Sequence, residues 1–437
     1  MRVLDWQQLD ADGRRAALAR PAAALQPRLL QQAQAIIDAV RSEGEPAVRR
    51  CTREFDGVEP ADFRVSRAEF AAARTQLTPE QLAAIDKAIA NVDSFHRAGL
   101  PAALSLEVQP GVRCERVIRP LSAVGLYVPA GAAPLPSSVI MLAVPARIAG
   151  CAQRVLCTPP QRSGAANAAV LVAAQLCGIE QVFKIGGAQA IAAMAYGAAC
   201  VPKVVKIFGP GNAWVTAAKQ LVAADPQGAA LDMPAGPSEV LVIADDSARA
   251  EFVAADLLAQ AEHDPLSQAM LLTTSATLAA AVAEAVRSQM QALARRAILQ
   301  QSIASSRILI VASLDEALAI CDRYAPEHLI IQTRNPRALL ERVQHAGSVF
   351  LGNWSPEPIG DYCSGTNHVL PTYGYARAYS GLSVQDFTRR MTVQELTADG
   401  LLDLGPTACT LARLEGLDAH AAAVELRLAA LGRERAA

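Results

Sequence analysis

Three short runs decide the fold: RVLCTPP at residues 154–160, NAAVLVAAQLCG at 167–178 and QVFKIGG at 181–187. The first and third are apolar runs that end in proline or glycine, as buried strands do. The middle run is rich in alanine and leucine and ends in glycine, which is typical of a helix. A strand, a helix and a second strand in this order predict a βαβ unit, and hence a parallel sheet covered by helices.

The same alternation continues on both sides of this unit. It includes CERVIRPLSAVGLYVP at 114–129 and VVKIFGPGN at 204–212. It resumes with SEVLVIADD at 238–246 and reaches EHLIIQTR at 327–334. We therefore predict an α/β fold with two such units.

The two ends of the chain have a different pattern. Residues 1–100 and the residues from about 390 onward carry apolar side chains at helical spacing and are predicted to be helical. The longest uncharged window, Pro120–Ala146, is rich in proline and glycine, so we expect a buried strand and a turn-rich loop there, not a membrane helix.

The composition is that of a soluble globular protein: 437 residues, 52% hydrophobic and 19% charged, with a formal net charge of −2. This charge balance argues against a nucleic-acid binder. Nine cysteines without a C-x-x-C pair argue against a disulfide framework and a thiolate zinc site. With no apolar signal segment at the start, we expect a reducing, cytoplasmic location.

Three glycine-rich or proline-rich turns follow predicted strands. LYVPAGAAPLPSS at 126–138 carries Tyr127, IGGAQAI at 185–191 carries Gln189, and GPGNAW at 209–214 carries Asn212. The complete G-x-G-x-x-G fingerprint and a Walker A motif are absent. Each turn alone is equally well explained as a tight turn, but three within one α/β unit favour a ligand cleft at the carboxyl ends of the strands.

Four of the six histidines lie in contexts that suit chemistry, whereas His96 and His345 are expected at the surface. Gln260 and His263 are three residues apart at a helix end, which puts them on one face; the alternative is a polar exposed face. Glu327 and His328 precede an apolar strand and suit general acid–base work, although a polar pair that merely leads a strand is as good a local explanation.

The remaining two histidines lie in polar or C-terminal segments. Asp361 and His368 belong to GDYCSGTNHVLPTYGYARAYSG at 360–381, and Glu415 and His420 flank Gly416. Glutamine, histidine and aspartate donors without a thiolate suit Zn²⁺, and also Mn²⁺ or Co²⁺.

The chain resembles the histidinol dehydrogenase family over nearly its whole length. The resemblance rests on LYVPAGAAPLPSSVIML, KIGGAQAIAAMAYG, IFGPGNAWVTAAK, DMPAGPSEVLVIAD, QAEHDPLSQAMLLT, YAPEHLII, DYCSGTNHVLPTYGYARAYSGL and EGLDAHAAAVELRL, in the family's order and spacing. Members of that family oxidise L-histidinol to L-histidine with two NAD⁺, through an aldehyde, at the end of histidine biosynthesis.

The resemblance also implies the roles of individual residues. One Zn²⁺ per subunit would be held by Gln260, His263, Asp361 and His420, with His420 and Glu415 donated by the second subunit of a homodimer. Glu327 and His328 would transfer protons. NAD would contact Tyr127, Gln189 and Asn212. The substrate L-histidinol would contact Ser238, Gln260, His263, His328, Asp361, His368, Glu415 and His420.

The fold that the resemblance implies is a pair of similar, incomplete Rossmann-like domains, as in aldehyde dehydrogenases, in an intertwined homodimer. We expect an N-terminal helical segment at 1–22, a metal-binding and catalytic domain at 23–126 with 237–380, an NAD-binding domain at 127–236 and a C-terminal helical segment at 381–437 that reaches the partner. Ala130 departs from the glycine expected there and should alter only the turn.

Three alternatives remain open at this point. The scaffold would also suit oxidation of another small alcohol, such as a sulfonated propanediol, to its acid. A non-catalytic NAD-binding or metal-binding protein is the second alternative, against which the Glu327–His328 pair argues. Within the main interpretation, Cys363 in the polar loop would offer a covalent route for the aldehyde step, although no neighbouring motif lowers a thiol pKa there.

Overall fold

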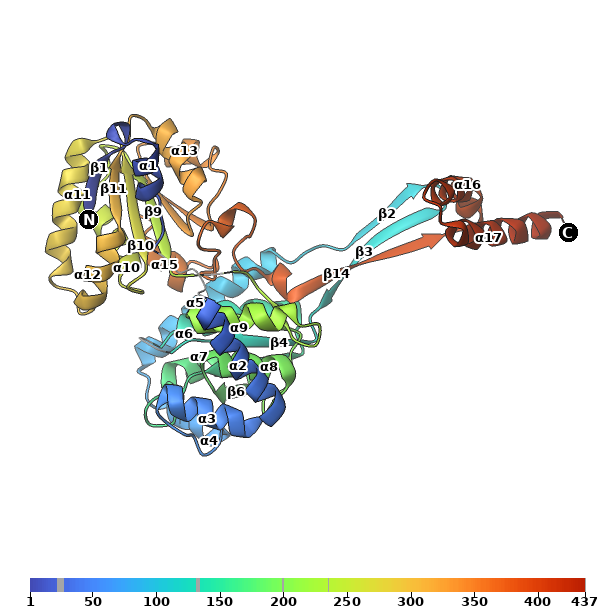
Figure 1. The fold of residues 1–437 in the computed structure, drawn as a ribbon, viewed down its shortest axis with the longest axis horizontal. Coiled ribbons are helices and arrows are strands. Elements are labelled where there is room, and N and C mark those ends of the chain that lie inside the picture. The colour runs from blue at the N-terminus through green and yellow to red at the C-terminus, as the bar shows by residue number, and fades with distance from the viewer. Residues whose placement is uncertain (22–26, 131–133, 199, 235, 437) are drawn as a thin grey trace. The chain divides into compact units, whose positions relative to one another are not determined.

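The computed structural model describes residues 1–21, 27–130, 134–198, 200–234 and 236–436. The chain divides into two compact units. Unit 1 comprises Met1–Gly99 and Leu121–Phe387, and unit 2 comprises Leu100–Pro120 and Thr388–Ala437. Unit 1 contains two parallel sheets, and unit 2 contains an antiparallel one (Figure 1).

Within the described residues, the first sheet of unit 1 has six parallel strands. Their order is β1 (Arg2–Asp5), β11 (Arg307–Ile310), β10 (Gln268–Thr273), β9 (Glu239–Ala244), β12 (His328–Gln332) and β13 (Ser348–Leu351). Both faces are buried, because Val240 and Val242 pack against one group of helices and Leu241 and Ile243 against another. The first group is α10 (Ala250–Ala261), α11 (Ala276–Met290) and α12 (Arg296–Ser305), and the second is α1 (Ala11–Ala17), α13 (Leu314–Tyr324) and α14 (Pro336–Leu340).

The second sheet of unit 1 has five parallel strands over the same described ranges. Their order is β6 (Gln181–Lys184), β5 (Gln153–Thr158), β4 (Ala123–Tyr127), β7 (Lys206–Phe208) and β8 (Ala230–Leu231). One face is covered by α2 (Pro27–Glu43), α3 (Glu45–Asp56), α8 (Gly187–Tyr196) and α9 (Ala213–Ala224). The other is covered by α4 (Arg67–Arg74), α5 (Pro79–Ala98), α6 (Pro136–Ala149) and α7 (Ala168–Leu176). The predicted βαβ unit is β5, α7 and β6, and the α/β class with parallel sheets is confirmed.

Unit 2 combines strands and helices. In its described part, three antiparallel strands lie in the order β14 (Thr388–Leu396), β3 (Val112–Pro120) and β2 (Leu104–Gln109). Two helices, α16 (Ala398–Leu414) and α17 (Asp418–Ala436), pack against each other. Short elements complete unit 1: α15 (Glu357–Tyr362) and the 3₁₀ turns η1 (Trp6–Gln8), η2 (Tyr375–Arg377) and η3 (Val384–Phe387).

Several local expectations were wrong. Residues Arg2–Asp5 form a strand, because their main chain pairs in parallel with β11, and Thr388–Leu396 forms a strand that pairs with β3. The uncharged window holds the buried strand β4 as expected, but much of the expected loop is the helix α6. His96 is buried, at 2% exposure, on the inner face of α5. Among the described residues, no helix combines the length and apolar character that a membrane span requires.

The expected domain boundaries stay a prediction. Helices α2 and α5, from the segment assigned to the catalytic domain, pack against α8 and α6 of the five-stranded sheet. The strand β1, from the segment expected to be a separate helical end, belongs to the six-stranded sheet. The sheet against which a helix packs its hydrophobic face is determined by tertiary packing, and the order of segments along the chain does not predict it.

Helix α6 tolerates an internal proline because another side chain takes over one hydrogen bond. Pro145 has no N–H with which to bond the carbonyl of Met141, one turn earlier. The side-chain nitrogen of Asn367 donates to that carbonyl instead, at 2.7 Å, and both groups are buried. The next residue, His368, approaches Ser138 on the same helix, so α6 anchors the loop that carries His368 at two points.

We predict that Asn367→Ala destabilises the protein by about 1–3 kcal/mol, because a buried carbonyl loses the side chain that donates to it. Adding Pro145→Ala should recover part of this loss, since an alanine at this position supplies the N–H that the helix lacks. Urea unfolding of the single and double variants measures the difference. Equal stability of the two variants would contradict this account of Pro145.

Candidate active site

The candidate catalytic and metal-binding residues gather at one edge of the six-stranded sheet. Glu239 and His328 are the first residues of β9 and β12, which are neighbouring parallel strands. Gln260 lies in the last turn of α10, which runs back from β9 to the start of β10. Ligands of open α/β sheets usually bind at the carboxyl ends of the strands, whereas these side chains lie at the amino ends.

Three side chains from two segments form a possible metal site. Among the described residues, His263, Glu357 and Asp361 each place one ligand atom so that all three atoms lie within 4.8 Å of one another. Glu357 and Asp361 are four residues apart on α15 and therefore share one helix face. His263 follows the end of α10 and is exposed, while Glu357 is 1% exposed.

Gln260 joins this group through its amide. The orientation that satisfies both side chains has the Gln260 nitrogen donating to the Glu357 carboxylate, 2.9 Å from Oε2. The Gln260 side-chain oxygen is then the atom of the amide that can bind a metal ion. Three of the four expected ligands, Gln260, His263 and Asp361, lie in one cluster with Glu357. Their oxygen and imidazole atoms are ligands of the kind that Zn²⁺ binds.

Glu357 was missed in the sequence. Its signal was present, because a glutamate four residues before Asp361 shares a helix face with it if the segment is helical. The two expected residues from the C-terminal segment, Glu415 and His420, belong to unit 2, where both are exposed. Their part in the site stays a prediction.

Glu327 and His328 are held by the main chain of one residue, Glu239. The N–H of Glu239 donates to Oε2 of Glu327 at 2.7 Å. The carbonyl oxygen of Glu239 lies 3.1 Å from Nδ1 of His328 and can only accept, so Nδ1 carries the proton. Nε2 of His328 has no hydrogen-bond partner among the described residues and lies 3.4 Å from Oδ1 of Asp361. The imidazole therefore turns Nε2 toward the carboxylate cluster.

Burial and crowding shift the ionisation of this group. Burial raises the pKa of Glu327 to about 8 and that of Glu357 to about 8. Burial lowers the pKa of His328, but the carboxylates of Glu357, Glu327 and Asp361 outweigh it and hold that pKa well above its usual value. So many buried acids around one imidazole need positive charge nearby, which a divalent cation would supply.

The other expected substrate residues flank the pair. Ser238 directly precedes Glu239 and is half-buried. His368 donates from Nδ1 to the carbonyl oxygen of Asp361 at 2.7 Å, so its Nε2 accepts from the Ser138 hydroxyl at 3.2 Å. Burial lowers the pKa of His368 and favours this neutral form. The contact ties the imidazole of His368 to the segment that carries Asp361.

The three predicted nucleotide-binding residues lie at the carboxyl edge of the five-stranded sheet. The hydroxyl of Tyr127, at the end of β4, accepts from the N–H of Gly187 at 3.0 Å. Gln189 is 1% exposed and its Oε1 has no partner among the described residues. Asn212 is exposed and caps α9 by accepting from the N–H groups of Trp214 and Val215.

At two of these turns, neighbouring atoms lie so close to a glycine that a side chain would not fit. Gly187 has φ of 61°, and a Cβ there would lie 2.7 Å from Oε1 of Gln189. A Cβ on Gly209 would clash with the carbonyl oxygen of Tyr127. The N-cap residue of helix α8 is a glycine without a capping side chain, so the N–H groups that follow Gly187 in its first turn suit a phosphate, while the N–H of Gly187 itself is bound by Tyr127. Ala130 is not among the described non-glycine residues with positive φ, so alanine fits that position without strain.

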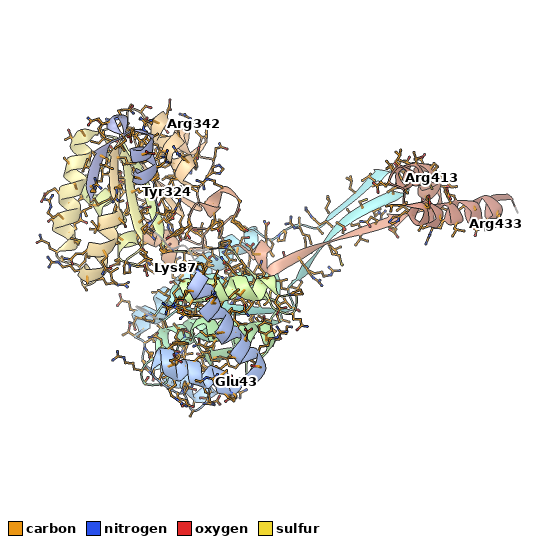
Figure 2. The ribbon with its side chains drawn as sticks, in the orientation of Figure 1. Glu43, Lys87, Tyr324, Arg342, Arg413 and Arg433 are labelled. Atoms are coloured by element: carbon orange, nitrogen blue, oxygen red, sulfur yellow. The ribbon has the colours of Figure 1, made fainter. Side chains whose placement is uncertain are left out.

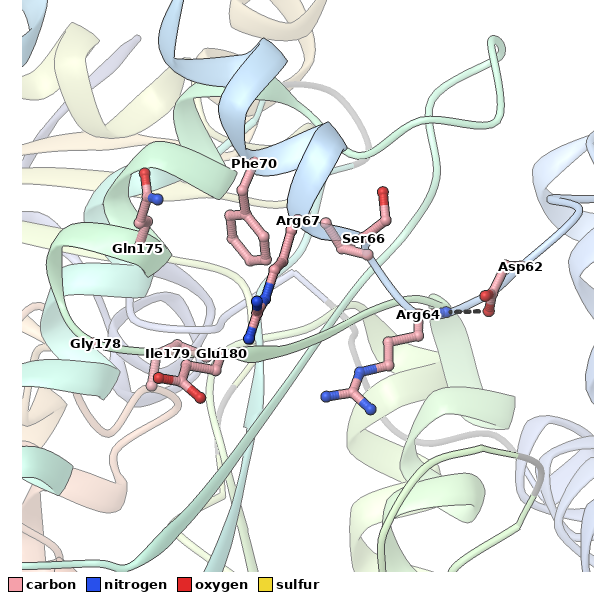
Figure 3. A pocket seen from close by; sticks show the side chains of 10 residues that line it. Asp62, Arg64, Ser66, Arg67, Phe70, Gln175, Gly178, Ile179 and Glu180 are labelled. Atoms are coloured by element: carbon pink, nitrogen blue, oxygen red, sulfur yellow. Dashed lines mark hydrogen bonds between the residues drawn. The ribbon is translucent and has the colours of Figure 1, made fainter.

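The pocket in Figure 3 is a separate feature. It has a volume of about 660 Å³ and is lined by residues including Arg64, Arg67 and Phe70, with Ile179 and Glu180 opposite. Its charged side chains are exposed, and none of the candidate residues line it. It does not contribute to the site described above.

Comparison with known proteins identifies the family that the chain resembles. The family model described as Histidinol dehydrogenase matches residues 19–428. A histidinol dehydrogenase of Xanthomonas campestris pv. campestris is 55% identical over 428 residues, covering 98% of this chain and 99% of the relative. One of Vibrio parahaemolyticus is 52% identical over 435 residues, covering 100% of both chains. A crystal structure of histidinol dehydrogenase from Elizabethkingia anophelis matches with a TM-score of 0.94 and 42% identity, covering 99% of each chain.

We predict that Glu357→Gln weakens divalent-metal binding about 10–100-fold, because the variant removes a charge from the cluster and loosens the Gln260 amide. Metal analysis after dialysis against a graded chelator measures the effect. His345→Gln is the matched control on an unrelated segment. Metal retention equal to that of the unchanged protein would show that Glu357 has no such role.

The metal-free protein should lose stability as pH rises. The folded-state pKa of Glu327 is about 8 against an ordinary 4.5, so the protonated acid favours the folded state. That contribution is complete below the ordinary value and is lost as pH rises through about 8. Melting of chelated protein between about pH 6 and pH 9 should show a fall that Glu327→Gln reduces. A slope unchanged by this variant would be evidence against the assignment.

Proposed function

The chain belongs to the histidinol dehydrogenase family, and from this membership we propose that it oxidises L-histidinol through L-histidinal to L-histidine with two NAD⁺ and one Zn²⁺ per subunit. The family places the chain among the oxidoreductases of histidine biosynthesis. The single observation that carries the mechanism is the state of His328. Its Nδ1–H is fixed on a main-chain carbonyl, which leaves the buried Nε2 as the nitrogen that can exchange a proton with the substrate.

The proposed ligands of Zn²⁺ are Gln260, His263 and Asp361, with His420 from a second copy of the chain. The clustered oxygen and imidazole donors and the unpartnered Nε2 of His328 support a cation there. When bound, Zn²⁺ supplies positive charge that orients the substrate, and NAD⁺ supplies the hydride acceptor. Tyr127, Gln189 and Asn212 would hold NAD⁺; the unpartnered Oε1 of Gln189 supports this role.

The chain's own residues would move the protons. Nε2 of His328 accepts the hydroxyl proton of L-histidinol in the first oxidation, giving the aldehyde. Glu327 then takes a proton from water as the water adds to the aldehyde carbonyl, and the proton held by His328 passes to the carbonyl oxygen, which completes the hydrate and frees Nε2 again. A pKa of about 8 for Glu327 suits this exchange near neutral pH. His328 accepts a second proton when the hydrate is oxidised to the acid. Ser238, His368 and Glu415 would position the substrate, so orientation contributes much of the rate.

We also propose that the active form is a homodimer. Unit 2 exposes many large apolar side chains, including Leu414 at 78% and Leu426 at 71%. Exposed apolar surface of this extent is typical of an interface. Residues Glu415 and His420 lie in the same unit, which supports their proposed service to a partner's site. A cytoplasmic location stays a prediction; all nine cysteines are described and free, which agrees with it.

Oxidation of a sulfonated propanediol is the less favoured alternative, because the relatives compared above are named for histidinol. Counting NADH formed per L-histidinol consumed tests the proposed function. Two NADH are expected, and prior chelation should abolish the signal until Zn²⁺ is restored. No NADH from L-histidinol would overturn the proposal and direct attention to other alcohols.

We predict that His328→Asn lowers kcat about 10²–10⁴-fold while KM for L-histidinol changes little, because the variant removes a general base. Steady-state rates with L-histidinol and L-histidinal measure both oxidations. Cys363→Ala is the control and should keep full turnover of the aldehyde. If Cys363→Ala instead lost the second oxidation, a covalent thiol route would replace the water route.

A further inference from the structure

We propose that Arg20 is a positioning residue for this reaction: its ion pair with Glu239 fixes the main chain that holds both Glu327 and His328. The inference rests on the proposed function and adds a residue from the N-terminal segment, far from the catalytic pair in sequence. Among the described residues, the hydrogen bonds of Arg20 reach the Glu239 carboxylate and the Tyr324 carbonyl, so it acts on the catalytic pair through Glu239.

The main chain of Glu239 makes two contacts that matter for catalysis. Its N–H orients the Glu327 carboxylate, and its carbonyl accepts from Nδ1 of His328, which turns Nε2 of that ring toward Asp361. A rotation of this backbone would misdirect both side chains at once. Strand pairing with β10 and β12 restrains the strand as a whole, but Glu239 is its first residue, where a strand is least restrained.

The side chain of Glu239 supplies the missing restraint. Arg20 binds it with two nitrogens, Nε on Oε1 and Nη2 on Oε2, the latter at 2.9 Å. The N–H of Tyr373 donates to Oε1 at 3.0 Å. The side chains of Arg20 and Glu239 are 16% and 2% exposed. A bidentate pair of this kind fixes both direction and distance, which a single point charge does not.

Arg20 is itself held firmly. Its guanidinium lies 3.9 Å from the centre of the Tyr324 ring, and its Nη2 also donates to the Tyr324 carbonyl at 2.8 Å. Tyr324 lies inside unit 1, as its label in Figure 2 shows, and its hydroxyl donates to Gln268 at 2.7 Å. Gln268 in turn donates to the carbonyl of Ala19, next to Arg20. The network closes on itself and leaves Arg20 one position.

Backbone strain at Tyr373, whose N–H binds the same carboxylate as Arg20, supports the same purpose. Tyr373 has φ of 55°, a conformation that bulky residues rarely adopt. The strain brings its N–H onto Glu239 and its hydroxyl onto the carbonyl of Pro21, at 2.9 Å. Residues held in such conformations persist where the surroundings over-determine them, and they cluster at functional sites. Arg20 and Tyr373 thus hold Glu239 from two segments.

Removing Arg20 should leave a buried carboxylate with fewer donors and without its counter-charge. The Glu239 carboxylate would then move toward water or become protonated. The main-chain groups of Glu239 that hold the catalytic pair would move with it. A displacement of about 1 Å in a catalytic arrangement costs about 10²-fold in rate. The loss should appear mainly in kcat, because among the described residues the hydrogen bonds of Arg20 reach Glu239 and Tyr324, and none of them reaches a proposed metal ligand.

The test compares Arg20→Met and Arg20→Lys in the full-length, zinc-loaded protein. For Arg20→Met we expect kcat with L-histidinol to fall about 100-fold, with KM and zinc content near those of the unchanged protein. Arg20→Lys keeps the positive charge but loses the bidentate geometry of the guanidinium. Its kcat should therefore lie between those of Arg20→Met and the unchanged protein. Added guanidinium ion should raise the rate of Arg20→Ala. Arg147→Met, which breaks the Arg147–Asp93 ion pair, is the matched control and should lower melting temperature without changing kcat.

Unchanged kcat in both Arg20→Met and Arg20→Lys would overturn the inference. So would a fall in kcat that matches a loss of zinc, or of folded protein, because a purely structural role predicts that pattern. If Arg20→Met fails to fold, Arg20→Lys and guanidinium rescue still decide. Absence of activity in the unchanged protein would instead refute the proposed function, so the two failures are distinguishable.

Discussion

Three carboxylates, those of Glu327, Glu357 and Asp361, surround the imidazole of His328, and the rest of the site depends on balancing their charge. Two of them are almost completely buried, and burial raises the pKa of Glu327 and Glu357 to about 8. Burying several negatively charged carboxylates together costs free energy unless a cation or bound protons neutralise them. In the proposed enzyme a divalent ion takes the charge, and the pKa of His328 falls toward a value at which it can accept a proton.

This constraint explains why the fold gathers side chains at the amino edge of one sheet. Glu239 and His328 open neighbouring strands, so the register of β9 and β12 fixes their relative position before any side chain acts. The turns predicted to bind NAD lie at the opposite kind of edge, after the strands of the other sheet. The candidate catalytic residues and the predicted NAD-binding residues therefore lie at opposite ends of parallel strands, in two different sheets.

Much of this arrangement could be predicted from the sequence, where local pattern determines structure. The βαβ rhythm identified both sheets, and the spacing of Gln260 and His263 put them at a helix end. The remainder depends on contacts distant in the chain. The pairing of β1 with β11 cannot be predicted from the four residues of β1. Pro145 would be expected to break a helix, and only the structure shows that the Asn367 side chain supplies the missing hydrogen bond to Met141. Glu357 escaped notice because its helix is only six residues long.

Anomalous X-ray scattering at the zinc edge, from crystals of the zinc-loaded protein, tests the central claim most directly. One peak per chain is expected, within bonding distance of Gln260, His263 and Asp361, with His420 of a second copy as the fourth protein ligand. A peak elsewhere, or a cluster that remains without zinc when the metal is in excess, would contradict it.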